Sequence, residues 1–137
     1  MLNITIKTIQ HAEQRYETPG NYGENQDHSV WFEISDLGNE TQEMAIALHE
    51  LLERHLCKLH GVNLAKIDEW DIAYEKIRKE RGVLPCGCPI QEEPGDDMHA
   101  PYHNEHFLAT LFEKEFMHIC GEDWEEYDKK VNALSQE

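Results

Sequence analysis

The spacing of apolar residues changes along the chain, from a period of two near its start to a helical period beyond residue 39. Residues 2–9 alternate apolar and polar, which predicts a strand with one buried face. A second strand is predicted over about 29–35, which is rich in Val, Trp, Phe and Ile. Residues 16–27 between them hold Pro, Gly, Asn and charged residues, so we expect a loop there.

Four helices are predicted to follow the strands. The first begins at Asn39, a residue type that caps helices, and ends before Gly61. The others are expected over about 64–80, 102–119 and 123–134. Apolar stripes give the predicted core faces of two helices: Ala45, Leu48, Leu52, Leu56 and Leu59 on the first, and Leu108, Leu111, Phe112, Phe116 and Ile119 on the third.

Only two or three residues join the first two helices, so we expect them to pack as an antiparallel hairpin. The predicted architecture is one α+β domain over residues 1–137. In it, a short N-terminal antiparallel β-ribbon precedes the four helices.

The chain is strongly acidic, with 28 Asp and Glu residues against 12 Lys and Arg and a formal net charge of −16. This charge repels phosphate, so direct nucleic-acid binding is not expected. No stretch resembles a membrane span, and the sequence MLNITIKTIQ lacks the pattern of a signal peptide. We therefore expect a cytoplasmic protein with no membrane partner.

The sharpest chemical signal is the segment His49-Glu50-Leu51-Leu52-Glu53. On a helix, His49 and Glu53 lie one turn apart on the same face, where they can share a metal ion. Glu50 points about 100° away from His49, as a general base beside such a metal would. Zincins carry H-E-x-x-H, so Glu53 departs from their pattern, whereas the imidazole of His49 favours zinc over magnesium. The alternative is a partly buried histidine that is hydrogen-bonded to a helix carboxylate.

Asp68 and Asp71 of the second helix stand beside this segment in the predicted hairpin, because both pairs of acids lie at similar distances from Gly61. Asp71 falls at the edge of an apolar stripe, where a carboxylate is costly unless it is paired or metal-bound. We expect both aspartates to orient the metal ligands through hydrogen bonds.

The third metal ligand is expected from the segment that follows residue 95. His106 is preferred, then His103, then Glu105 or Asp97. A separate zinc site would require Cys57 and Cys120 to converge on the close pair Cys86 and Cys88. Free thiols are the favoured interpretation of these four cysteines.

Several segments together resemble a family of small, uncharacterised phage and prophage proteins that carry an H-E-[LV]-[LIV]-E helix. The resemblance covers most of the chain. It rests on residues 47–53, 67–71, 93–97, 100–102 and 105–106. It implies a phage setting, and hence the cytoplasm of a host cell, but no particular activity.

Three functions stay open on this sequence. We favour a zinc-dependent, zincin-like hydrolase of phage origin, with a small-molecule or peptide substrate. In it, His49, Glu53 and His106 hold the metal and Glu50 is the catalytic base. A strand directly ahead of the active-site helix is typical of that fold.

The second candidate is a nucleotide pyrophosphohydrolase of the MazG type, which uses magnesium or manganese. There Glu50 and Glu53 on one helix would face Asp68 and Asp71 on the next. The third is a non-enzymatic acidic inhibitor of a host DNA-binding or defence protein. Acids that converge with His49 in a cleft favour metal chemistry, whereas acids spread along the last helix favour inhibition by mimicry.

Overall fold

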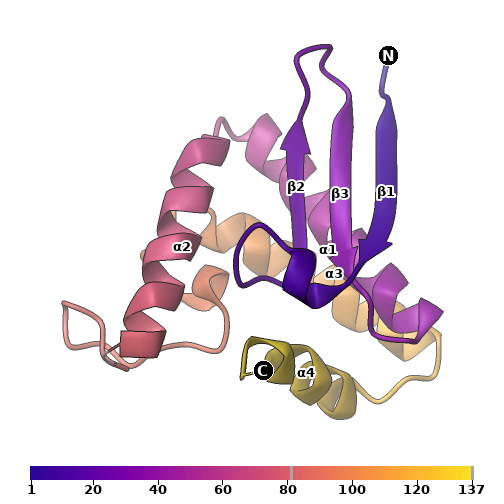
Figure 1. Ribbon diagram of the computed structural model, residues 1–137. Helices are drawn as coiled ribbons and strands as arrows, with labels where there is room; N and C mark the ends of the chain where they lie inside the picture. The colour runs from indigo at the N-terminus through magenta and orange to yellow at the C-terminus, as the bar shows by residue number, and fades with distance from the viewer. Residues whose placement is uncertain (81, 137) are drawn as a thin grey trace.

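The sheet comes first along the chain and the helices follow it, as the α+β prediction requires (Figure 1). The computed structural model describes residues 1–80 and 82–136. The strands are β1 (Ile4–Ile9), β2 (Gly20–Glu24) and β3 (Val30–Ser35). The helices are α1 (Glu40–Leu59), α2 (Leu64–Glu80), α3 (His103–Ile119) and α4 (Trp124–Ala133). Short 3-10 turns lie at His11–Glu13, Pro94–Asp96 and Leu134–Gln136.

The sheet is mixed, so the predicted antiparallel ribbon is wrong. Its strand order is β1-β3-β2, with β1 parallel and β2 antiparallel to β3. The strand β2 is not predicted and lies in the segment expected to be a loop. Its residues Gly-Asn-Tyr-Gly-Glu have low strand propensity, which is why no sequence signal indicates it. Gly23 is nevertheless suited to its place, since a Cβ there would come within 2.4 Å of the Trp31 ring on β3.

Burial in the sheet is centred on β3 rather than on β1. Val30, Phe32 and Ile34 are buried, and β3 packs against α1. The predicted buried face of the first strand is wrong, since β1 is an edge strand whose residues 4–8 are all exposed. The alternation of apolar and polar residues therefore predicted the position of this strand correctly, but not that its residues are exposed.

The helix boundaries agree with the predicted ones to within one or two residues. Asn39 caps α1, its side-chain oxygen accepting a hydrogen bond from the backbone N–H of Gln42 at 3.0 Å. Gly61 and Gly121 follow α1 and α3 with φ of +72° and +75°, a conformation that favours glycine at a helix end. Across the described part of the chain, no helix combines the length and apolarity needed to cross a membrane.

The helix packing differs from the prediction, because α1 lies along α3 and not along α2. The two helices run antiparallel: His60 at the end of α1 contacts Glu105 at the start of α3, and Ala45 shares a core cluster with Met117 near the end of α3. In the described residues α2 joins α1 near their connecting turn, where Ile67 belongs to the same cluster as Cys57. In Figure 1, α2 stands to one side of the sheet. The predicted α1–α2 hairpin is therefore wrong.

The faces that α1 and α3 bury include many polar residues, so the predicted core faces are confirmed only in part. Ala45 of the first stripe is buried and Phe116 of the other stripe packs against the same core cluster. Leu59, Phe112 and Ile119 of the apolar stripes are 69%, 67% and 73% exposed. The buried residues of the two helices include these polar ones: His49, Glu50, Glu53, Arg54, Glu105, His106 and Glu113. Buried charges are tolerated where they are paired and hydrogen-bonded, so the contacts among these side chains decide which faces turn inward.

Candidate metal centre

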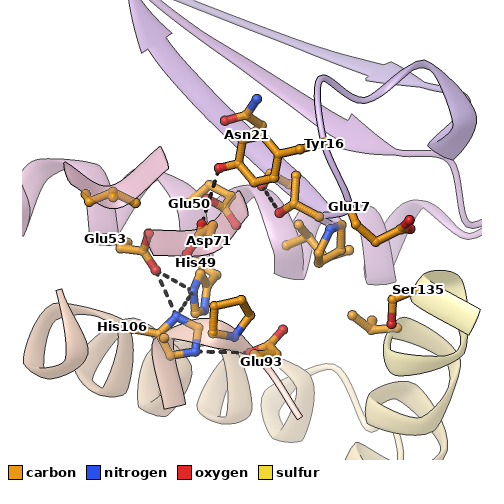
Figure 2. Close-up of a pocket in the computed structure, with 18 of the residues that line it drawn as sticks. Tyr16, Glu17, Asn21, His49, Glu50, Glu53, Asp71, Glu93, His106 and Ser135 are labelled. Carbon is orange, nitrogen blue, oxygen red and sulfur yellow. Dashed lines mark hydrogen bonds and ion pairs between the residues drawn. The ribbon is translucent and has the colours of Figure 1, made fainter. Parts of the chain in front are cut away.

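The three residues predicted as metal ligands meet between α1 and α3 (Figure 2). His49 Nε2 lies 3.0 Å from Glu53 Oε2, and His106 Nδ1 lies 2.9 Å from the same oxygen. The two ring nitrogens are 3.2 Å apart. All three side chains are buried, at 6%, 4% and 6% exposure for His49, Glu53 and His106.

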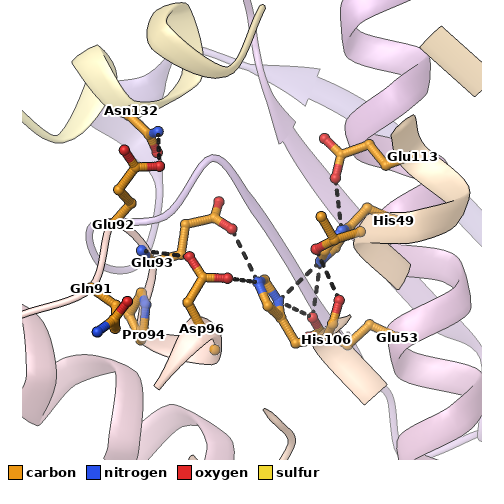
Figure 3. Close-up of polar contacts among 12 residues, drawn as sticks. His49, Glu53, Gln91, Glu92, Glu93, Pro94, Asp96, His106, Glu113 and Asn132 are labelled. Carbon is orange, nitrogen blue, oxygen red and sulfur yellow. Dashed lines mark hydrogen bonds and ion pairs between the residues drawn. The ribbon is translucent and has the colours of Figure 1, made fainter. Parts of the chain in front are cut away.

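In each imidazole ring, the nitrogen that points away from Glu53 contacts another carboxylate (Figure 3). We call these two atoms, His49 Nδ1 and His106 Nε2, the outer nitrogens. His49 Nδ1 lies 2.8 Å from Glu113 Oε1. His106 Nε2 lies 3.0 Å from Glu93 Oε2 and 3.2 Å from Asp96 Oδ1. Because an ionised carboxylate only accepts hydrogen bonds, each outer nitrogen carries a proton. The inner nitrogens, His49 Nε2 and His106 Nδ1, face Glu53, and once they lose their protons their lone pairs are available to a shared cation.

Three lone-pair-bearing atoms this close together repel one another unless a cation lies among them. Without a metal, protons take that place. Burial would lower the pKa of His49, but hydrogen bonds with Glu113 and Glu53 raise it well above its ordinary value. Burial would likewise lower the pKa of His106, yet Asp96, Glu53 and Glu93 raise it.

Glu53 stays ionised, although it is buried as deeply as the two histidines. Burial alone would raise its pKa, but hydrogen bonds from His106 and His49 outweigh burial and lower the pKa to about 2. Tyr22 of β2 donates a further hydrogen bond to Glu53 Oε1 at 2.9 Å. The Glu53 carboxylate is therefore held in its charged form, the form that a metal ion would need.

The residues present fit a zinc ion. Ligand atoms around tetrahedral zinc stand about 3.3 Å apart, close to the three separations observed. Two imidazoles and one carboxylate also make a ligand set that catalytic zinc sites use. Gly95 supports the arrangement from the Pro94–Asp96 turn, because a Cβ at this position would lie 2.4 Å from the His106 ring.

Glu50 lies in the pocket beside the three ligands (Figure 2) and is 8% exposed. In the described part of the chain its carboxylate has no hydrogen-bond partner. Burial, and then repulsion by Glu53, raise its pKa well above the usual range. Gly20 leaves room for it, since a Cβ there would lie 2.7 Å from Glu50 Cγ. A raised pKa makes an unpaired carboxylate a stronger base, which suits Glu50 to accept a proton from a reacting group.

The aspartates of α2 line the same pocket without bonding to the ligands. Asp71 accepts hydrogen bonds from Tyr102 and from Tyr16, the latter at 3.2 Å. Burial raises its pKa to about 7. Asp68 is paired with Arg15 and Tyr16, both at 3.3 Å.

The orienting role predicted for Asp68 and Asp71 is corrected accordingly, because the hairpin on which it depended does not form. Glu113, Glu93 and Asp96 contact the ligand rings instead. The sequence reasoning missed Glu113, although a signal was there. It lies seven residues after His106, on the same face of α3 as Ala109.

The other candidate ligands have partners elsewhere. His103 Nδ1 lies 3.0 Å from the carbonyl oxygen of Gly95, Glu105 contacts His60, and Asp97 contacts His99. All four cysteines are free thiols, and none belongs to the groups of described residues that are arranged to share an ion. Of the four predicted alternatives, His106 is the one that the structure places beside His49 and Glu53.

The pocket has a volume of about 80 Å³ and is rich in acids. Besides Glu50 and Glu53, its lining includes seven further carboxylate side chains: Glu17, Asp68, Asp71, Glu75, Glu92, Glu93 and Glu113. This concentration of negative charge repels an anionic ligand and attracts a cationic one.

Comparison of the chain with known proteins gives no match, whether to a family model, to a curated protein or to a solved structure. The phage setting therefore rests on the sequence resemblance alone and stays a prediction.

Proposed function

We propose that this protein is a zinc-dependent hydrolase with a zincin-like site on α1. The observation that carries the proposal is the triangle of His49 Nε2, Glu53 Oε2 and His106 Nδ1, whose sides are 3.0, 2.9 and 3.2 Å. Carboxylates on the outer nitrogens of both rings are the usual support of histidines that bind zinc.

The residues around this triangle have distinct chemical roles. Zinc held there would supply Lewis acidity, which polarises a substrate carbonyl and makes water more acidic. Glu50 accepts the proton of the attacking water and returns it to the leaving group. Glu113 and Glu93 keep His49 and His106 in the tautomers that bind metal.

The acidic pocket favours a neutral or cationic amide substrate, such as a peptide, over a nucleotide. A phosphate group would face Asp68, Asp71 and Glu75 among other acids. The magnesium pyrophosphohydrolase alternative also depends on an α1–α2 hairpin, whereas α1 packs along α3. The acidic-inhibitor alternative is disfavoured because many acids converge with His49 in one pocket.

The test is hydrolysis by protein reconstituted with zinc, using a fluorogenic peptide library and, in parallel, nucleoside triphosphates. Glu50→Gln should lower peptide hydrolysis by about a thousandfold or more while zinc stays bound. Glu40→Gln, an exposed position on the same helix, serves as the matched control. Full activity of Glu50→Gln, or cleavage of triphosphates alone, would contradict the proposal.

A further inference from the structure

The close pair of cysteines, Cys86 and Cys88, lies in the loop that follows α2, outside the lining of the acidic pocket. A hydrogen bond from the Gly87 backbone N–H to the Leu84 carbonyl oxygen, 2.9 Å long, closes a turn around Cys86. Pro85 and Gly87 hold the second and fourth positions of this turn, which are places that these residue types favour. Because Leu84 is buried, the turn is anchored in the fold. Cys86 is thus held in a defined conformation at the surface.

The turn brings the second cysteine back onto the first. The backbone N–H of Cys88 donates a hydrogen bond to Cys86 Sγ at 3.4 Å. Gly87 between them has a φ of +80°, a conformation that favours glycine, and an antiparallel bridge joins Val83 to Pro89 on either side of the pair. Cys86 is exposed and Cys88 is half-buried, so a small reactant in solution can reach both thiols.

The two thiols of the pair differ in acidity. Hydrogen bonds from the Cys88 side chain and from its backbone N–H lower the pKa of the Cys86 thiol, and the contact with Cys86 raises the pKa of Cys88. The other two cysteines lack this arrangement. Cys57 is buried, and burial raises the pKa of its thiol to about 12. Cys120 is exposed, but among the described residues no other cysteine is hydrogen-bonded to it.

The surroundings of the pair favour a disulfide over a metal site. Two thiolates would supply only half of the ligands of a tetrahedral zinc ion. Neither cysteine belongs to a group of three described side chains that are arranged to share an ion. A disulfide between Cys86 and Cys88 would close a very short loop, so chain entropy would stabilise it little and it would be readily reduced again.

We propose that Cys86 and Cys88 form a redox-active dithiol that low-molecular-weight disulfides, such as oxidised glutathione, oxidise reversibly. The Cys86 thiolate attacks one sulfur of the small disulfide, forms a mixed disulfide with it and expels the first thiolate, which takes up a proton from water. Cys88 then gives its proton to water, attacks Cys86 Sγ and expels the second thiolate. The two cysteines lose two electrons and two protons in total, and the small disulfide gains them. No metal takes part, so the exchange is independent of the proposed hydrolysis.

The test is to treat untagged protein with oxidised glutathione, quench it with an alkylating reagent and weigh the tryptic peptide 82–114. This peptide holds Cys86 and Cys88 and neither of the other cysteines. The wild-type peptide should lose two hydrogen atoms and carry neither glutathione nor an alkyl group, and excess reduced glutathione should restore both thiols. Cys88→Ser should keep one glutathione on Cys86, because the second attack is removed. Cys86→Ser should react about tenfold more slowly than Cys88→Ser.

Cys120→Ser is the matched control, since it changes an exposed cysteine outside the pair. Its disulfide should close as fast as that of the wild type. A wild-type peptide that is alkylated on both cysteines after the oxidant, or that keeps glutathione as Cys88→Ser does, would overturn the proposal. Equal rates for Cys86→Ser and Cys88→Ser, or a disulfide that persists in excess reduced glutathione, would overturn it as well.

Discussion

The inner and outer faces of the α1–α3 pair invert the usual pattern of an amphipathic helix. The inner face, which turns toward the pocket, is buried and carries His49, Glu53, His106 and Glu113, whereas several large apolar side chains on the outer side are mostly exposed: Leu59, Phe112 and Ile119. Burial follows hydrophobicity when apolar contact is the main gain, but a polar face can be buried when each charge finds a partner. The inner face of this protein is arranged for pairing, which is typical of a functional site.

The largest expected effect is on metal binding at the inner face. His49→Ala and His106→Ala should each lower zinc affinity by more than about 100-fold, because each removes one of the proposed ligands. Competition with a zinc-sensitive dye measures the change. His55→Ala, at an exposed position of α1, is the control and should bind as the wild type does. Equal affinities in all four proteins would mean that the inner face is not a metal site.

Glu113→Gln weakens the hydrogen bond that orients His49 and leaves His49 itself in place. Because Glu113 contacts His49 Nδ1 at 2.8 Å, we expect a loss of about 10- to 100-fold in zinc affinity. Glu115→Gln, an exposed change two residues along α3, should leave the affinity unchanged. The same dye competition tests both variants, and equal losses would show that only helix charge matters.

The buried carboxyl group of Asp71 should make the free energy of unfolding depend on pH. Burial raises the pKa of Asp71 to about 7 from an ordinary 3.8, so the folded protein holds this proton while the unfolded chain releases it between those pH values. The stabilisation from Asp71 is therefore fully present below about pH 4 and is lost as the pH rises through 7.

Asp71→Asn should remove this dependence. Between pH 5 and 8 the wild type should lose on the order of 2 kcal/mol more stability than the variant. Urea unfolding of chelator-treated protein measures the difference, with Asp36→Asn, an exposed position, as the control. Parallel pH curves for wild type and Asp71→Asn would show that this aspartate is not held protonated.

Two glycine substitutions distinguish the role of His106 in metal binding from the role of Glu50 in hydrolysis. Gly95→Ala would push a Cβ against the His106 ring and should lower zinc affinity about tenfold. Gly20→Ala would instead displace Glu50, so hydrolysis should fall while zinc affinity is kept. Dye competition and peptide hydrolysis are measured on both variants. If the two alanines act alike, His106 and Glu50 do not have separate roles.

Much of the fold could be predicted from local sequence signals. Asn39 and Gly61 mark the ends of α1, and His49 with Glu53 at helical spacing marks half of the site. These signals depend on neighbours within one or two turns. The strand β2 escaped prediction because its glycines make room for Trp31 and Glu50, which are contacts that only the folded chain reveals.

The burial of the helix faces could not be predicted from the sequence for a similar reason. The leucine stripe of α1 resembles a core in isolation. Its polar face is buried only because His106 and Glu113 arrive from α3, 57 and 64 residues away from His49. The preference for His106 as third ligand agrees with the observed geometry, yet periodicity alone did not distinguish it from His103.

The most direct test of the central claim is the metal content of untagged protein purified without chelator, measured by inductively coupled plasma mass spectrometry. The account predicts about one zinc per chain, lost in His49→Ala and kept when Cys86 and Cys88 are both changed to Ser. A wild-type protein that contains no metal, and takes up none when zinc, manganese or magnesium is added, would contradict it.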